Sequence, residues 1–257
     1  MPGPLDLDIY AKRIKSMRIA VISDIHGNME ALQEVFDDIE KSSVDTTICL
    51  GDMVGYGPEP EAVVQRIISR GIPTVMGNHE LAVLDPAYVE LFNPAARKSI
   101  LTIIPWLSDE SLAFISGLES SLTMHSGRFV HGFPPDSIIT YLFQINNDGL
   151  VDAFRHLEEK ICFVGHTHKM SIVSWDGKDV SKAPLKEGHV KLYADRQYII
   201  NNGSVGQPRD GNNSAKYLIW DVAEHSLDIR FVPYHIAKVT NKIVEAGLPD
   251  VHADRLW

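Results

Sequence analysis

Short apolar segments that each end in a polar, glycine-containing turn constrain the fold of this chain more than any other feature. Residues 17–23, 46–50 and 72–76 are apolar and rich in β-branched side chains, and helix-like stretches at 29–42 and 61–70 separate them. Strands that alternate with helices indicate βαβ units, which build a parallel sheet buried on both faces. The first half of the chain therefore predicts an α/β fold.

Later parts of the chain show a different strand pattern. Strand-like segments resume at 127–131 and 160–164. Beyond Met170, further strand-like segments follow with hairpin-like turns between them, at 171–175, 189–194, 197–201, 216–222 and 227–234. We expect these later segments to form a second, antiparallel sheet within the same domain rather than a separate domain.

The domain is expected to span residues 17–246. Residues 1–16 precede the first strand and contain no hydrophobic signal-peptide segment, so we interpret them as an N-terminal extension. A proline-interrupted helical stretch at about 81–125 predicts a cap-like segment within the domain. Residues 247–257 follow the predicted closing helix and are expected to form a C-terminal tail.

Charge and cysteine content limit the partners and the compartment. The chain has 34 acidic and 24 basic residues, a net charge of −10, and no lysine or arginine block. This excludes duplex nucleic acid and anionic membrane as expected partners, because both require a basic surface. A small phosphorylated substrate fits, since bound metal ions reverse the local field. Cys49 and Cys162 lie in apolar runs and predict buried free thiols, which suits a cytoplasmic protein.

Polar side chains of a few types follow five of the apolar segments. They are Asp24, His26, Asp52, Asn78, His79, His131, His166 and His168. Ligands of open α/β sheets bind outside the carboxyl ends of the strands, so these residues predict one site. Imidazole, carboxylate and amide oxygen together favour Mn, Fe or Zn. Each motif alone has an ordinary explanation as a turn or polar loop, but their joint occurrence at strand ends indicates a metal site.

The series resembles the motifs of the calcineurin-like metallophosphoesterases. Asp-x-His, Gly-Asp, Gly-Asn-His-Glu, a later His and Gly-His-x-His begin at residues 24, 51, 77, 131 and 165, respectively. The segments SDIHGNMEALQEV, LGDMVGYGPEP and NNGSVGQPRDGN are similar to a compact bacterial phosphodiesterase-like branch of that family. The resemblance covers residues 17 to about 233. It implies an α/β fold with a two-sheet β-sandwich flanked by helices, in four αββα layers.

The resemblance also implies a role for each site residue. Asp24, His26 and His168 would hold one divalent cation, Asn78, His131 and His166 would hold a second, and Asp52 would bridge the two. Mn²⁺ is the expected metal, with Fe²⁺, Zn²⁺, Ni²⁺ or Co²⁺ as alternatives. A hydroxide bridging the metals would attack phosphorus in line. His79 would be the catalytic histidine, stabilising charge or protonating the leaving oxygen.

Two positions depart from the related Ser/Thr phosphoprotein phosphatases. Their Gly-Asp-x-Val-Asp-Arg-Gly motif is matched here by residues 51–57, in which Gly55 and Tyr56 replace the Asp and the Arg. This disfavours phosphoprotein phosphatase activity and leaves no evident residue to orient His79. Because a phosphodiester carries one charge fewer than a monoester, we expect a phosphodiester or another small phosphorylated substrate such as a nucleotide.

Two residues are candidate substrate contacts, each with a second explanation. Tyr56 could stack on a base or could cover the edge of the site. Arg209 could contact phosphate or form an ion pair with Asp210 or another carboxylate. Nucleotide pyrophosphatase or dinucleoside polyphosphate hydrolase activity stays open. The complete ligand set disfavours a non-enzymatic scaffold of the same fold, and the absence of Gly-x-Gly-x-x-Gly after the first strand disfavours a Rossmann-type binder.

Overall fold

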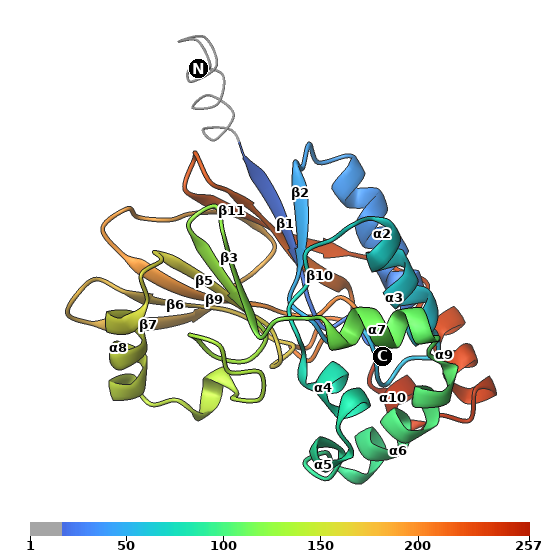
Figure 1. Ribbon diagram of the computed structural model, residues 1–257. Coiled ribbons are helices and arrows are strands. Elements are labelled where there is room, and N and C mark those ends of the chain that lie inside the picture. Colours follow the sequence, from blue (N-terminus) through green and yellow to red (C-terminus); the bar gives the residue numbers. More distant parts are fainter. Residues whose placement is uncertain (1–16) are drawn as a thin grey trace, which may run out of the picture.

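The computed structural model describes residues 17–257, which form two mixed β-sheets packed face to face between layers of helices (Figure 1). The five-stranded sheet has the order β2 (Thr46–Cys49), β1 (Arg18–Ile22), β10 (Ala215–Asp221), β11 (Ser226–Val232) and β8 (Gly188–Lys191). The six-stranded sheet has the order β3 (Ser121–Met124), β4 (Gly127–Val130), β5 (Ile161–Val164), β9 (Gln197–Asn202), β6 (Met170–Trp175) and β7 (Val180–Pro184). The predicted two-sheet sandwich is confirmed. The N-terminal extension expected at 1–16 lies outside the described residues.

The helices arise where apolar residues recur on one face behind a capping side chain. In α2 (Met29–Glu40) the buried residues are Ala31, Leu32, Val35, Phe36 and Ile39, a helical stripe that faces the sheet. Asn28 caps this helix by accepting a hydrogen bond from the Ala31 amide. The other helices are α3 (Pro60–Ser69), α4 (Asn78–Leu84), α5 (Pro86–Val89), α6 (Pro94–Ile103), α7 (Asp109–Ser116), α8 (Asn147–His156), α9 (Ile236–Glu245) and α10 (Val251–Asp254). Two 3₁₀ turns, η1 (Ile104–Trp106) and η2 (Leu142–Gln144), complete the elements.

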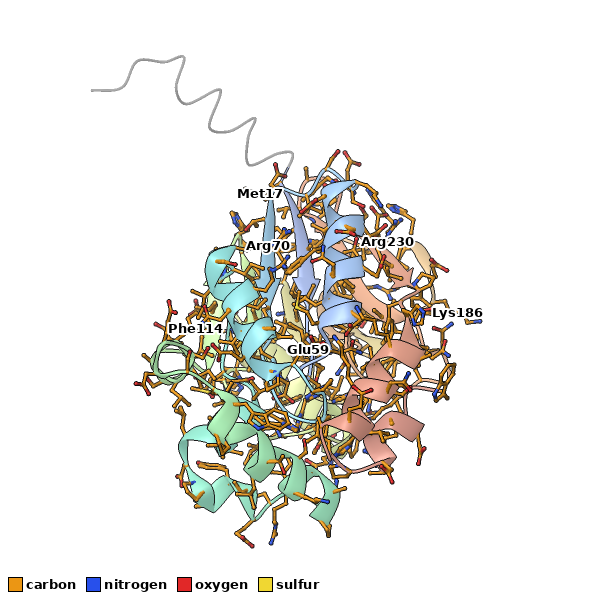
Figure 2. The ribbon with its side chains drawn as sticks, turned by 90° about the vertical axis from the view of Figure 1, so that its right-hand side faces the viewer. Met17, Glu59, Arg70, Phe114, Lys186 and Arg230 are labelled. Atoms are coloured by element: carbon orange, nitrogen blue, oxygen red, sulfur yellow. The ribbon has the colours of Figure 1, made fainter. Side chains whose placement is uncertain are left out.

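Three hydrophobic clusters lie between the four layers. The middle cluster joins the two sheets and includes Val21 of β1 and Phe163 of β5. A second cluster packs Phe36 of α2 against Tyr217 of β10, and a third packs Phe154 of α8 against the outer face of the six-stranded sheet. Figure 1 shows α8 and the helices α2 and α3 on opposite sides of the molecule. Figure 2 views the side covered by α2 and α3, with Glu59 and Arg70 at the two ends of α3.

Strand partners differ from those expected. We expected the strands after Met170 to form a separate antiparallel sheet, and this is wrong. β10 pairs antiparallel with β1, and β9 pairs parallel with β5, so the later strands divide between both sheets. Residues 72–76 make only isolated bridges at Thr74 and Val75 instead of a regular strand. The reason is that apolar periodicity identifies a strand but carries no information about its neighbour.

The remaining segments pack closely on this framework. The stretch expected as a helical cap, 81–125, contains helices from α4 to α7 and ends in β3. Residues 247–257, which we expected to form a tail, include α10, and Leu256 is buried in the same cluster as α2. Both cysteines are buried free thiols, as predicted. None of the helices within residues 17–257 has the length and apolar character needed to cross a membrane.

Candidate metal centre

Loops at the carboxyl ends of β1, β2, β4 and β5 meet at one edge of the two sheets. Backbone hydrogen bonds tie these loops together, from Asp24 N to Gly51 O (3.1 Å) and from Gly165 N to His131 O (2.8 Å). The loop after β9 joins them through a bond from Gly206 N to Asp24 O (2.9 Å). Since both sheets contribute parallel strands that end here, side chains from distant parts of the chain converge on one place.

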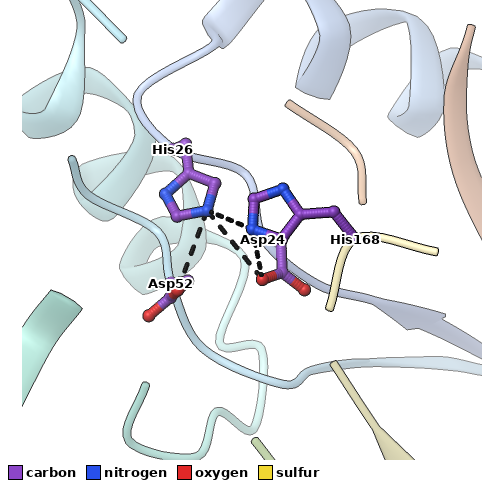
Figure 3. A group of neighbouring side chains, drawn as sticks. All are labelled: Asp24, His26, Asp52 and His168. Atoms are coloured by element: carbon purple, nitrogen blue, oxygen red, sulfur yellow. Dashed lines mark hydrogen bonds and ion pairs between the residues drawn. The ribbon is translucent and has the colours of Figure 1, made fainter. Parts of the chain in front are cut away.

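The first group of converging side chains consists of Asp24, His26, Asp52 and His168 (Figure 3). His168 Nε2 lies 3.3 Å from Asp24 Oδ1 and 3.2 Å from His26 Nε2. His26 Nε2 lies 3.7 Å from Asp52 Oδ2. All four side chains are buried. The three residues expected to hold one cation therefore surround a common point with the expected bridging carboxylate beside them.

A second group contains Asp52 again, now with His131 and His166. His131 Nε2 lies 3.3 Å from Asp52 Oδ2 and 3.2 Å from His166 Nδ1. Asn78, at the start of α4, brings its Oδ1 to 3.0 Å from the same His131 nitrogen. Asp52 is thus the one residue shared by both groups, as a bridging ligand must be.

The donor set fits metal ions because the histidine tautomers are determined by the backbone. One ring nitrogen of each histidine lies within hydrogen-bonding distance of a carbonyl: His26 Nδ1 with Val54 O (2.9 Å), His131 Nδ1 with Leu50 O (2.7 Å), His168 Nδ1 with Gln207 O (2.6 Å) and His166 Nε2 with Ile139 O (3.2 Å). A carbonyl only accepts, so these nitrogens carry the hydrogen. In the first group, the Nε2 atoms of His26 and His168 therefore direct lone pairs at each other. A cation between them removes that repulsion.

Backbone conformation at the site is strained in a consistent way. Five of the seven expected ligands have positive φ: Asp24 (53°), His26 (50°), Asp52 (53°), His166 (67°) and His168 (58°). Such angles are uncommon for residues with a Cβ atom and are found where the fold holds a functional side chain in place. These backbone angles let residues two apart, such as Asp24 and His26, direct their side chains into the same site.

Burial and charge at the site favour a bound cation. Burial raises the pKa of Asp24 to about 7. Burial opposes protonation of His131, but the carboxylates of Asp52 and Asp24 outweigh it and raise its pKa to about 9. Burial lowers the pKa of His166 to about 3, which keeps its imidazole neutral and able to bind a metal. Buried carboxylates without a positive partner are costly, so the site attracts positive charge.

His79 lies beside the shared carboxylate and is enclosed by aromatic rings. Its Nε2 is 3.9 Å from Asp52 Oδ2, and its Nδ1 is buried with no hydrogen-bond partner within residues 17–257. The rings of Tyr56 and Phe92 meet its imidazole edge-on at centroid distances of 4.6 and 4.7 Å. Burial lowers the pKa of His79 to about 4. Ring packing takes the place of an orienting carboxylate.

Tyr56 forms a wall of the site. Only 7% of its surface is exposed, and its ring lies 4.4 Å from that of His26. On its other side the ring of His252 from α10 lies at 4.7 Å. This enclosure leaves no free face for stacking on a base, so the geometry matches the covering role. His252 was not expected near the site, and no local sequence signal places the last helix there.

Arg209 lies in the loop after β9. It does not form the ion pair with a carboxylate that was the alternative to a phosphate contact. Asp210 pairs with Lys216 (2.8 Å), not with Arg209. No carboxylate of residues 17–257 lies within 4.0 Å of the Arg209 guanidinium, which bonds to Gln207 Oε1 (2.8 Å) and lies 5.5 Å from the Tyr56 ring centre. Its positive charge therefore remains available beside the first group of ligands.

Glu80 is a further residue of the site, for which no role was expected. Its carboxylate accepts hydrogen bonds from the backbone amides of Asp52 (2.7 Å), Met53 (2.7 Å), Val54 (3.1 Å) and Gly77 (3.1 Å). These bonds hold the loop that carries the shared ligand against the start of α4. The acidic last position of Gly-Asn-His-Glu was the available signal for this function.

Comparisons of the sequence agree with this geometry. The sequence profile described as calcineurin-like phosphoesterase matches residues 17–194. An uncharacterized protein of Methanocaldococcus jannaschii is 38% identical over 249 residues, which cover 95% of this chain and 98% of that protein. A symmetrical bis(5'-nucleosyl)-tetraphosphatase of Paracidovorax citrulli is 31% identical over 125 residues, or 43% of this chain and 44% of that enzyme.

Solved structures share the architecture. A metallophosphoesterase from Sphaerobacter thermophilus matches with a TM-score of 0.83 at 33% identity, covering 94% of this chain and 98% of that chain. A hypothetical protein from Pyrococcus horikoshii matches with a TM-score of 0.76 at 17% identity, covering 94% and 98% of the two chains. The second likeness supports the fold alone.

Proposed function

The chain belongs to the calcineurin-like phosphoesterase family, and from that premise we propose that it hydrolyses a phosphodiester with the help of two divalent cations. The observation that carries the proposal is that Asp52 belongs to both groups of buried ligands. A carboxylate shared between two sets of imidazole ligands is the arrangement that a pair of cations requires. Mn²⁺ is the metal that we expect, because the donors are oxygen and imidazole nitrogen.

The seven ligands divide by position. Asp24, His26 and His168 would hold the first cation, Asn78, His131 and His166 would hold the second, and Asp52 would be shared between them. When bound, the cations supply an activated water and neutralise charge on the phosphoryl oxygens. The hydrogen bonds from the histidines to backbone carbonyls keep the rings oriented while this charge changes.

The chain's own residues complete the reaction. Hydrolysis adds the oxygen of water to phosphorus and breaks one P–O ester bond, and the leaving oxygen takes up a proton. His79, 3.9 Å from the shared carboxylate, is placed to donate a hydrogen bond or a proton to that oxygen. Arg209 lies on the side of His168 and contributes positive charge toward a phosphoryl oxygen. One substituent then leaves as an alcohol, and the other stays attached to phosphorus in the phosphomonoester product.

A phosphodiester is favoured over a monoester by the positions that replace the phosphatase motif. Gly55 and Tyr56 replace the Asp and the Arg of that motif, so the orienting carboxylate and the phosphate-binding guanidinium are both missing. A dinucleoside polyphosphate is the second candidate substrate, because the similarity to the Paracidovorax citrulli enzyme covers 125 residues. That similarity spans less than half of either chain, so it supports the candidate without distinguishing it from a simple diester.

The test is a direct one. The protein is purified without chelator, its metal content is measured, and it is assayed with added Mn²⁺. Substrates are bis-p-nitrophenyl phosphate, p-nitrophenyl phosphate, and a nucleotide panel that includes diadenosine tetraphosphate. We expect two metals per chain and the highest kcat/KM on the diester. Turnover of diadenosine tetraphosphate alone would favour the second candidate, and a failure to bind metal under any loading condition would refute both.

A further inference from the structure

A cleft opens directly over the second group of metal ligands. Asn78 and His166 form its floor, and its volume is about 140 Å³. An engineered protein cavity of roughly 150 Å³ holds one benzene molecule, so a flat ring fits a space of this size. Because the floor consists of expected ligands, the cleft is within reach of a substituent on a phosphate bound there.

The walls of the cleft are apolar and come from two distant segments. Tyr88, Leu91 and Phe92 form one wall at the end of α5, and Ile139 and Tyr141 form the other wall in the loop after β4. Leu91 and Ile139 expose 68% and 45% of their surfaces, so apolar area on both walls is open to a ligand. The two walls thus present aromatic and aliphatic surface to whatever lies between them.

The chemistry of the lining distinguishes between possible occupants. None of the cleft's seven lining residues carries a carboxylate, ammonium or guanidinium group. Arg209 does not line the cleft, and its guanidinium lies 5.5 Å from the centre of the Tyr56 ring. An acidic peptide or a further phosphate would find no partner between these walls, whereas a planar uncharged ring would stack on them.

We propose that this cleft is the binding subsite for a planar aromatic substituent of the substrate, of the nucleobase class. The inference rests on the proposed function, since it describes one ester group of the same phosphodiester. It also replaces the expectation for Tyr56, whose ring is enclosed by three histidine rings at 4.4, 4.6 and 4.7 Å. The Tyr141 ring is itself stacked on His166 at 3.6 Å, so the surface open to a ring comes mainly from Tyr88, Leu91 and Ile139.

Binding to the Mn²⁺-loaded protein tests the subsite. Isothermal titration calorimetry compares thymidine 5'-monophosphate with methyl phosphate, two monoesters that differ in the nucleoside. We expect thymidine 5'-monophosphate to bind at least about tenfold more tightly, the gain typical of one stacked base. The double variant Tyr88→Ser/Leu91→Ser should lose this preference while it retains its affinity for methyl phosphate.

Controls separate the subsite from a general effect on the fold. Leu101→Ser replaces another exposed leucine, on α6 and outside the cleft, and should keep the preference. Ile139→Ser tests the opposite wall and should reduce the preference on its own. Equal affinities for the two ligands in the wild type would overturn the inference. The proposed function would survive that result if the same preparation hydrolyses methyl p-nitrophenyl phosphate, and would fail independently if it does not.

Discussion

Gly55 lies directly against the imidazole of His79. A Cβ atom at position 55 would lie 2.0 Å from His79 Nδ1, and Gly55 has a φ of +87°, which side chains rarely adopt. The residue that replaces the phosphatase aspartate is thus a glycine because His79 occupies the space. Tyr56 and Phe92 pack around the ring where a carboxylate would otherwise orient it.

The first prediction follows from this contact. Gly55→Ala should displace His79 and lower kcat by about tenfold to a hundredfold, equivalent to roughly 1.4–3 kcal/mol of lost transition-state stabilisation. Metal content should be unchanged, because Gly55 is not a ligand. Gly177→Ala is the matched control, since Gly177 has a similar φ of +92° but nothing within 4 Å of an added Cβ. Equal turnover in the two variants would contradict a positioning role for Gly55.

His79→Ala should separate catalysis from metal binding. We expect kcat on bis-p-nitrophenyl phosphate to fall by roughly 10²–10⁴-fold, the range for loss of a general acid, while two metals per chain remain. Elemental analysis and steady-state kinetics on the same preparation measure both quantities. His156→Ala alters an exposed histidine on α8 and should leave both unchanged. Full activity in the His79 variant would remove this residue from the mechanism.

Asp52→Asn should weaken metal occupancy at both positions. An amide supplies one neutral oxygen where the carboxylate supplies two charged ones, so it neither bridges two cations nor balances their charge. We expect fewer than two metals per chain after dialysis against a weak chelator, compared with two for the wild type. Asp179→Asn, at an exposed position, serves as the charge-matched control. If the Asp52 variant kept two metals per chain, Asp52 would not be the ligand that bridges the two cations.

A fourth prediction concerns stability away from the site. Asp38 of α2 accepts two hydrogen bonds from Arg230 of β11, at 2.7 and 3.0 Å, and one from the Tyr217 hydroxyl at 2.6 Å. Figure 2 shows Arg230 next to α2. The bonds from Arg230 hold the pKa of Asp38 below its ordinary value of 3.8. Asp38→Asn should lower the free energy of unfolding at pH 7 by about 1 kcal/mol, since Arg230 is partly exposed to solvent.

The difference in unfolding free energy between wild type and Asp38→Asn should shrink in acid. Because the folded-state pKa of Asp38 is depressed, its stabilising contribution is complete above pH 3.8 and is lost as the pH falls through the folded-state value. Urea unfolding at pH 7 and near pH 3 should therefore show a smaller gap between wild type and variant in acid. If the difference in unfolding free energy between wild type and the Asp38 variant grew in acid, the stabilising role of the ionised Asp38 would be contradicted.

Local sequence determined much of the secondary structure and all of the candidate ligands. β-branched apolar runs stiffen into strands wherever they are buried, and short polar motifs with glycine follow each of them. The positions of Asp24, Asp52 and His168 after apolar strands predicted that they share one site. This was possible because turn chemistry and strand propensity depend on residues that are neighbours in the chain.

Tertiary structure alone decided how these pieces meet. The pairing of β10 with β1, the placement of His252 against Tyr56, the pairing of Asp210 with Lys216, and the cleft between Leu91 and Ile139 all join distant segments. Such contacts form when the core packs, and a buried strand or ring can pack against any of several partners of similar shape. The secondary-structure propensities of these possible partners are similar, so only the complete fold determines which of them are in contact.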